Sequence, residues 1–162
     1  MILVTGASGF IGSSLCKELQ ARNIGFLEAS RQYSENKNHF YIPNINKDTN
    51  WKEPLRHSEK VIHTAARVHV MHDNSEDSLK KFESINLYGT LNLAEQSIQE
   101  GVKRFIFLSS IKVNGEETKK NHPFFYDDLV SPQDPYALSK YKAEQQLKDL
   151  CKGTPMDLVI VR

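Results

Sequence analysis

The chain has 162 residues, enough for one domain with a hydrophobic core and too few for two domains of ordinary size. Its 21 Lys and Arg residues nearly balance 20 Asp and Glu residues, so it lacks the broad positive field that nonspecific nucleic-acid binding requires. Hydrophobic residues make up 39%, which is ordinary globular usage. No apolar run is long enough to span a membrane, and residues 1–12 do not show a basic region followed by a cleavable apolar core. We expect a cytoplasmic domain that binds neither nucleic acid nor membrane.

Short apolar segments alternate with longer segments of helical spacing. We predict helices over 11–22, 75–100 and 134–151, with a short one over 51–57, although the apolar residues of 75–100 follow helical spacing only roughly. This alternation predicts an α/β fold, a parallel sheet with helices on both faces. The predicted strands are 2–4, 25–27, 39–42, 61–62, 105–108 and 158–161.

Two further segments indicate where a site lies and how far the domain extends. Residues 112–134 contain Asn114-Gly115, Pro123 and Pro132, and Pro135 follows directly, which predicts a long loop of the kind that usually belongs to a binding site. The last predicted strand, 158–161, has nothing after it to cover its edge of the sheet. We therefore expect residues 1–162 to be one domain of a truncated protein.

Three glycines directly follow the first predicted strand and open the first predicted helix. Gly6, Gly9 and Gly12 are spaced G-x-x-G-x-x-G. A backbone that passes close to a pyrophosphate has no room for Cβ atoms, and a helix N-terminus offers unpaired N–H groups and the positive end of its dipole. The spacing therefore predicts a phosphate cradle, with a simple tight turn as the alternative. No Gly-Lys-Ser/Thr follows, which excludes a P-loop.

A tyrosine and a lysine share one face of the last predicted helix. Tyr136 and Lys140 are an i, i+4 pair, so the ammonium can lie near the phenol or the ligand it binds. A nearby cation favours phenolate and brings a general acid or base closer to its working pH. Ser109 and Ser110 follow the fifth strand, at the edge where open α/β sheets bind ligands. The alternatives are a half-buried Tyr with a solvated Lys, and serines that serve only as caps.

Taken in order, these motifs resemble the extended short-chain dehydrogenases/reductases, specifically the NAD-dependent epimerase/dehydratase family around UDP-glucose 4-epimerase. The resemblance covers essentially the whole chain. It implies a Rossmann sheet with strand order 3-2-1-4-5-6, a tightly held nicotinamide cofactor and a UDP-sugar substrate. It rests on Thr5-Gly6-Ala7-Ser8-Gly9-Phe10-Ile11-Gly12, His63-Thr64-Ala65-Ala66, Asn86-Leu87-Tyr88-Gly89-Thr90, Ser109-Ser110 with Val113-Asn114-Gly115, and Tyr136 to Lys140.

The resemblance also implies roles for individual residues. Tyr136 is expected to be the catalytic acid/base, Lys140 to bind the nicotinamide ribose and lower the Tyr136 pKa, and Ser110 to hydrogen-bond the reacting sugar oxygen. Ser109 is a second-rank candidate, and Asn86 is expected to brace the site. The expected cofactor-binding residues are Gly6, Ser8, Gly9, Phe10, Ile11, Gly12, Ser30, Arg31, Asn44, Ile45, Ala65, Ala66, Tyr136 and Lys140.

The chain departs from the family at the end of the second strand, where an acidic residue usually accepts the ribose hydroxyls of NAD. Ser30 and Arg31 stand there, and a hydroxyl followed by a guanidinium suits the 2′-phosphate of NADP. NADP is therefore slightly favoured. NAD remains the alternative, with Glu28 reached by a different register. Asn44-Ile45 replaces the usual Asp-Ile near the adenine, and Asn114 replaces a Tyr and receives no role.

Several functions stay open at this point. The first is a UDP-hexose 4-epimerase, and a close variant is an NADP-dependent reductase of a UDP-4-keto-6-deoxy-sugar. A noncatalytic dinucleotide-binding module is the alternative of another class. The resemblance further implies a homodimer and a C-terminal substrate domain absent from this chain. A metal site at Arg67, His69, His72 and Asp73 is not expected, since no third ligand is defined.

Overall fold

A parallel sheet forms the centre of the computed structural model, which describes residues 1–68, 78–118 and 120–162. Within these ranges the six strands follow the order β3-β2-β1-β4-β5-β6, and every neighbouring pair is parallel. This confirms the predicted fold class and strand order. The strands are β1 (Ile2–Thr5), β2 (Phe26–Ser30), β3 (His39–Tyr41), β4 (Lys60–His63), β5 (Arg104–Leu108) and β6 (Asp157–Val161).

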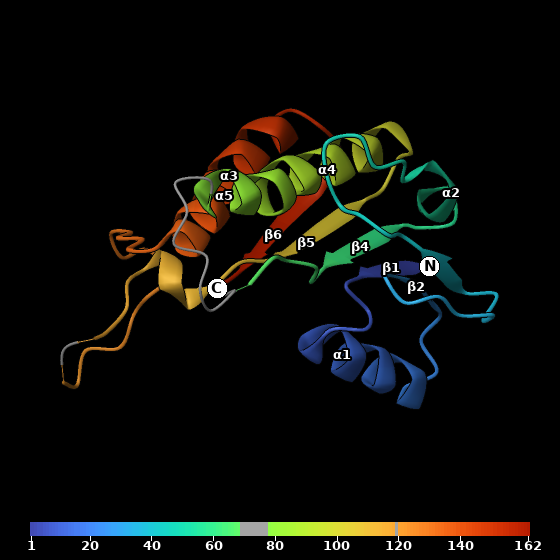
Figure 1. Cartoon of the computed structure of the whole chain (residues 1–162), viewed down its shortest axis with the longest axis horizontal. Coiled ribbons are helices and arrows are strands. Elements are labelled where there is room, and N and C mark those ends of the chain that lie inside the picture. The colour runs from blue at the N-terminus through green and yellow to red at the C-terminus, as the bar shows by residue number, and fades with distance from the viewer. Residues whose placement is uncertain (69–77, 119) are drawn as a thin grey trace.

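Helices cover both faces of the sheet. Figure 1 shows α1 on one face and α3, α4 and α5 on the other, as in a doubly wound fold. In the described ranges no helix is long and apolar enough to cross a membrane. The helices are α1 (Phe10–Ala21), α2 (Lys52–Leu55), α3 (Ser78–Phe82), the π-helix η1 (Glu83–Gly89), α4 (Thr90–Gln99), the 3₁₀ turn η2 (Ile111–Val113) and α5 (Pro135–Cys151).

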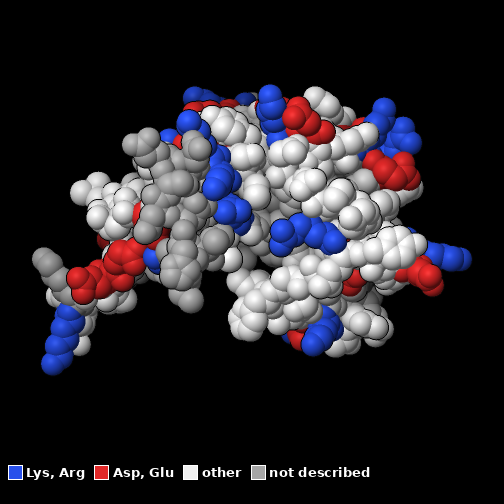
Figure 2. Space-filling model, viewed as in Figure 1, with Lys and Arg blue, Asp and Glu red and all other residues white. Residues whose placement is uncertain are grey.

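The sheet separates two apolar layers because successive side chains of a strand point to opposite faces. Leu3 of β1 belongs to the larger layer beneath α4 and α5, whereas its neighbour Val4 packs with Cys16 and Leu19 of α1. Burial of both faces explains why the strands read as nearly continuous apolar runs. Acidic and basic side chains lie interspersed on the face shown in Figure 2, in agreement with the near-neutral net charge.

The helix predicted over 75–100 is where sequence and structure differ most. Residues 75–77 lie outside the described residues, and the remainder is α3, then η1, then α4. A π-helix pairs residues i and i+5, so it rotates the apolar face relative to a regular α-helix. This interruption explains why the apolar residues of this segment follow helical spacing only roughly.

Candidate active site

The glycine-rich turn is tight because two of its glycines touch other backbone atoms. Gly6 leaves β1 with φ +71°, and a Cβ placed on it would lie 2.7 Å from the Cα and N of Ala65. A Cβ on Gly12 would collide with the carbonyl oxygen of Gly6. Neither position admits a side chain without moving backbone. The loop after β4 therefore packs directly on the turn after β1.

The N-terminus of α1 is open. Gly9 is the N-cap residue, and no side chain there hydrogen-bonds the N–H groups of the first turn. The first turn contains no acidic residue. The N–H groups of Phe10, Ile11 and Gly12 have no hydrogen-bond partner in the part of the chain that the structure describes. Unpaired N–H groups and the positive end of the helix dipole suit a negatively charged group. Together with the turn, which a Cβ would fill, they fit the pyrophosphate of a dinucleotide.

His63, the last residue of β4, joins three elements beneath this edge of the sheet. Its Nδ1 lies 2.6 Å from the Thr5 hydroxyl of β1, and its Nε2 lies 2.9 Å from the Thr90 hydroxyl of α4. Burial, with a smaller contribution from the charge of Lys140, lowers the pKa of His63 to about 3. The ring is therefore neutral at physiological pH and acts as a hydrogen-bonding link.

Lys140 lies in α5 with its side chain only 1% exposed. Burial lowers the pKa of Lys140 to about 7, and the charge of Glu144 one turn later opposes this shift. Its Nζ lies 4.0 Å from the ring centroid of Phe107 in β5. A buried ammonium at the carboxyl edge of the sheet fits a contact with the hydroxyl groups of a nucleotide ribose.

Tyr136 is the second residue of the same helix and packs edge-on against Phe82, with ring centroids 6.2 Å apart. Its pKa is raised above 10.0, mainly by burial, while a hydrogen bond with the Ser110 side chain acts in the opposite direction. The expected lowering of the Tyr136 pKa by Lys140 is therefore wrong. Lys112 is the cation whose charge lowers this pKa, and its contribution is smaller than that of burial. The Ser110 side chain nevertheless lies close enough to Tyr136 to affect its pKa.

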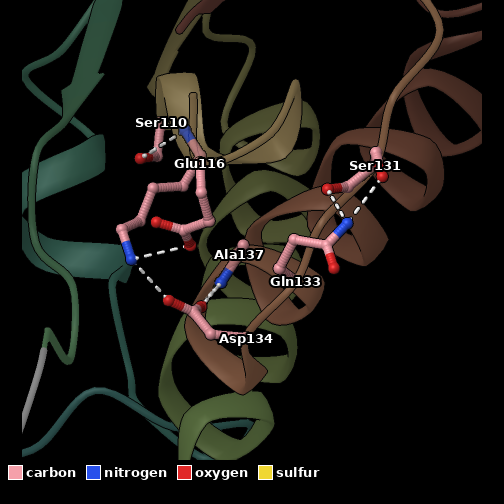
Figure 3. Close-up of polar contacts among 7 residues, drawn as sticks. Ser110, Glu116, Ser131, Gln133, Asp134 and Ala137 are labelled. Atoms are coloured by element: carbon pink, nitrogen blue, oxygen red, sulfur yellow. Dashed lines mark hydrogen bonds and ion pairs between the residues drawn. The ribbon is translucent and has the colours of Figure 1, made fainter. Parts of the chain in front are cut away.

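The start of α5 is fixed to the loop after β5 by Asp134. Its Oδ1 accepts a hydrogen bond from the Ala137 N–H at 2.6 Å, a standard N-cap, and its Oδ2 accepts one from Lys112 Nζ, also at 2.6 Å. Lys112 Nζ also donates to Glu116 (Figure 3). Ser110 in turn caps η2 by accepting from the Lys112 N–H. These contacts hold the Tyr136 turn beside Ser110.

Ser109 belongs to a different network. Its hydroxyl donates to Glu144, a fully buried carboxylate that also binds the Arg162 guanidinium. Arg162 additionally donates to Asn114, which is 4% exposed. Ser109 therefore ties β5 to α5. The structure gives Asn114, for which the sequence indicated no role, a hydrogen bond that links it to Arg162.

Asn86 braces the site from the π-helix, as the resemblance implied. Its side chain pairs with both backbone groups of Arg67, at 2.8 and 3.0 Å, and donates to the Ser139 hydroxyl at 3.0 Å. Ser139 in turn donates to the carbonyl of Tyr136 at 2.7 Å. The loop after β4 and the first turn of α5 are thus held together. Sequence reasoning did not identify Ser139, because one serine within a helix carries no distinctive pattern.

The second strand ends at Ser30, as predicted, and Arg31 follows it. Ser30 Oγ is engaged by the backbone of Gln32 and by Nε2 of His39. Glu28 pairs with Val4, one residue before the end of β1, and hydrogen-bonds Cys16 beneath α1. The alternative in which Glu28 occupies the acidic position is therefore not the one the structure adopts.

The remaining predicted cofactor residues lie on neighbouring loops. Asn44 is exposed, and Ile45 packs so closely on Gly89 that a Cβ there would lie 2.7 Å from Ile45 Cγ2. Ser8 is exposed. Ala65 packs against Gly6, and Ala66 is the next residue in the chain. His69, His72 and Asp73 lie outside the described residues.

The parallel sheet, the glycine turn and the Tyr136–Lys140 helix together define a Rossmann-type domain of the short-chain dehydrogenase/reductase class. The chain belongs to the NAD-dependent epimerase/dehydratase family, whose model matches residues 2–162.

Individual relatives agree with this assignment. The chain is 43% identical to a UDP-glucose 4-epimerase of Vibrio cholerae over 164 residues, 99% of this chain and 50% of that protein. It superposes on Thermotoga maritima UDP-glucose 4-epimerase, solved with UDP-glucose, with a TM-score of 0.80 and 28% identity, covering 99% of this chain and 54% of that one. For Bacillus cereus UDP-glucuronic acid 4-epimerase with NAD, the TM-score is 0.83 at 25% identity, covering 99% and 55%. The chain thus spans about half the length of these relatives.

Proposed function

We propose that this chain is the dinucleotide-binding half of a nucleotide-sugar 4-epimerase that acts on a UDP-hexose. The observation that carries the proposal is the convergence of three features on one edge of the sheet. These are the open N-terminus of α1, the buried ammonium of Lys140, and the phenol of Tyr136 beside Ser110. The relatives named UDP-glucose 4-epimerase support the substrate class.

The residues present fit a nicotinamide dinucleotide. The N–H groups at the start of α1 suit its pyrophosphate, the small Ala65 packs on the glycine turn beside them, and Lys140 suits the nicotinamide ribose. When bound, the cofactor supplies the acceptor and donor of hydride. The chain itself then has to bind the reactants, orient them and move a proton.

In this proposal the proton transfer belongs to Tyr136. The phenolate accepts the proton of the sugar 4-hydroxyl as that carbon is oxidised, and the phenol returns it when the carbon is reduced from the other face. Ser110, whose side chain acts on the Tyr136 phenol by lowering its pKa, orients the same sugar oxygen. Burial and the charge of Asp134 raise the Tyr136 pKa, so the phenolate is favoured only by the opposing effects of the Ser110 side chain and the charge of Lys112.

One observation favours a second function, an NADP-dependent reductase of a UDP-4-keto-6-deoxy-sugar. Ser30 ends β2 and Arg31 follows it, while Glu28 lies two residues before the end of the strand and close enough to Cys16 to raise the pKa of that thiol. A guanidinium there favours a 2′-phosphate, and net reduction uses an NADPH pool. The NAD named in the Bacillus cereus structure favours the epimerase.

Calorimetric titration of the chain with NAD and NADP tests both proposals. Arg31→Ala is expected to weaken NADP binding at least about tenfold and to leave NAD binding unchanged if Arg31 binds a 2′-phosphate. Tighter binding of NAD, unaffected by Arg31→Ala, supports the epimerase and contradicts the reductase. A folded chain that binds neither dinucleotide contradicts both.

Three broader predictions accompany this proposal. Turnover of a UDP-hexose by an active protein containing this chain separates an enzyme from a noncatalytic dinucleotide-binding module. The homodimer, expected through the predicted helices 75–100 and 134–151, is tested by sedimentation, where a monomer at tens of micromolar concentration would count against it. A cytoplasmic location is tested by fractionation of the source cells.

A further inference from the structure

The ammonium of Lys140 is held by an aromatic ring. Lys140 Nζ lies 4.0 Å from the ring centroid of Phe107, well within the distance at which a cation is attracted to a ring face. Lys140 is 1% exposed and Phe107 is fully buried. In residues 1–68, 78–118 and 120–162, no oxygen or nitrogen atom accepts a hydrogen bond from Lys140 Nζ. The ring is therefore a principal partner of a charge that has lost most of its water.

The charged groups around Lys140 do not replace this contact. Glu144, one turn further along α5, is already bound by Arg162 and Ser109, so its charge is largely shared with another cation. His63 of β4 is neutral, because burial lowers its pKa to about 3. Tyr136, one turn earlier, is a neutral phenol because its pKa is raised. The negative face of the Phe107 ring is thus left to offset the cost of burying the ammonium.

The ring plane of Phe107 is itself fixed from the other strand. His63 stacks on Phe107 with centroids 6.0 Å apart and an interplanar angle of 20°. His63 is immobilised by its contacts with the hydroxyls of Thr5 and Thr90. A continuous set of contacts therefore runs from the end of β1, beside the glycine turn, through His63 and Phe107 to the Lys140 ammonium.

We propose that Phe107 is a positioning residue, whose ring face keeps the Lys140 side chain charged and placed at the carboxyl edge of the sheet, where the ribose of the dinucleotide is to be bound. Binding of the ribose at this edge rests on the proposed function. The cation–π contact itself does not depend on it.

Phe105 offers a matched control. It lies two residues earlier in β5, on the same face of the strand, and is also fully buried. Its ring lies 6.1 Å from His63 but tilted by 49°, and its only described ring contact is with His63. Phe105→Leu and Phe107→Leu therefore remove the same atoms from the same apolar layer. They differ in whether Lys140 loses its ring.

The test is NMR of the chain labelled with ¹³C at the lysine ε carbon, with Lys140 assigned from its missing signal in Lys140→Met. We expect Phe107→Leu to lower the pKa of Lys140 by about 0.5 to 1 and to remove the upfield shift that a ring face imposes on the ε protons. Phe105→Leu should leave both quantities unchanged. Phe107→Met, whose flexible unbranched side chain adapts better to the space left by the ring, is the second variant if Phe107→Leu does not fold.

Identical Lys140 titration and chemical shift in the Phe105 and Phe107 variants would overturn the proposal. Dinucleotide titration supplies the functional readout, in which Phe107→Leu should weaken binding by about three- to tenfold relative to Phe105→Leu. If the unaltered chain binds no dinucleotide, the proposed function fails. The NMR comparison still decides whether Phe107 holds the ammonium.

Discussion

The Arg162 guanidinium donates two hydrogen bonds to the Glu144 carboxylate, from Nη2 to Oε2 at 2.6 Å and from Nε to Oε1 at 3.0 Å. The Glu144 side chain is completely buried, and that of Arg162 is 17% exposed. A second pair, Arg22 and Glu18 on α1, has the same shortest distance of 2.6 Å but side chains 69% and 58% exposed. The Glu144–Arg162 pair is therefore an ion pair in the interior, and the Glu18–Arg22 pair is its counterpart in solvent.

Glu144→Gln is expected to destabilise the chain by about 3 kcal/mol, because it leaves a partly buried guanidinium without its charge partner. Arg22→Ala should cost less than about 0.5 kcal/mol, since water screens the exposed pair. Urea denaturation of both variants measures the difference. Equal free energies of unfolding for the two variants would contradict the role given to the Glu144–Arg162 pair.

Gly6→Ala is expected to cost more stability than Gly101→Ala, although both residues have positive φ, +71° and +77°. At Gly101 a Cβ meets nothing within 4 Å, so only the backbone strain of about 1 kcal/mol remains. At Gly6 the added Cβ also collides with the backbone of Ala65. Denaturation should show a further loss of at least about 2 kcal/mol for Gly6→Ala, and calorimetry should show lost dinucleotide binding. Similar losses of stability in Gly6→Ala and Gly101→Ala would mean that the loop after β4 can move to accommodate the added Cβ.

His63 should make the chain sensitive to acid. Its pKa is about 3 in the folded chain against 6.5 for the free side chain, so below pH 6.5 the unfolded state binds a proton that the folded state does not. Stability should therefore fall as pH falls from 6.5 toward 3, by about 2 kcal/mol between pH 6.5 and 5 from this residue alone. His63→Gln should flatten this part of the pH profile of unfolding. His57→Gln, at an exposed site, is the control and should leave the pH profile of unfolding unchanged.

Lys140 should make dinucleotide binding depend on pH near neutrality. Its ammonium is present below a pKa of about 7 and is lost as pH rises through that value. Affinity for an anionic dinucleotide is therefore expected to decrease between pH 6 and 8.5, by at most about tenfold per pH unit. In Lys140→Met, calorimetric titration across this range should give weaker binding with this dependence removed. An unchanged pH dependence would assign it to another group.

Tyr136→Phe removes one hydroxyl and keeps the ring that packs on Phe82. In an active protein containing this chain, turnover is expected to fall about 10²- to 10⁴-fold, the usual contribution of a general acid or base. Dinucleotide affinity should change little, which separates this variant from Lys140→Met. Near-normal turnover by a folded Tyr136→Phe protein would mean that Tyr136 has only a packing role.

Much of the fold follows from local patterns. Apolar runs such as Leu3-Val4, buried on both faces, alternate with helical segments, and this alternation requires a parallel sheet. The glycines at 6, 9 and 12 and the Tyr136–Lys140 spacing are also local, so the glycine turn and the helix face were predictable. The strand order came from resemblance, because periodicity does not say which strands are neighbours. The π-helix at 83–89 escaped prediction because it breaks the period on which prediction depends.

The tertiary structure alone decided the electrostatics. Spacing along α5 suggested that Lys140 lowers the Tyr136 pKa, but burial dominates this pKa, and the cation that lowers it is Lys112 from another segment. Likewise, Ser109 and Ser110 are adjacent in sequence, yet one meets Glu144 and the other Tyr136, because successive residues of extended backbone point to opposite sides. Sequence fixes which groups exist and their local period. Burial and contacts between distant segments set their charge and their partners.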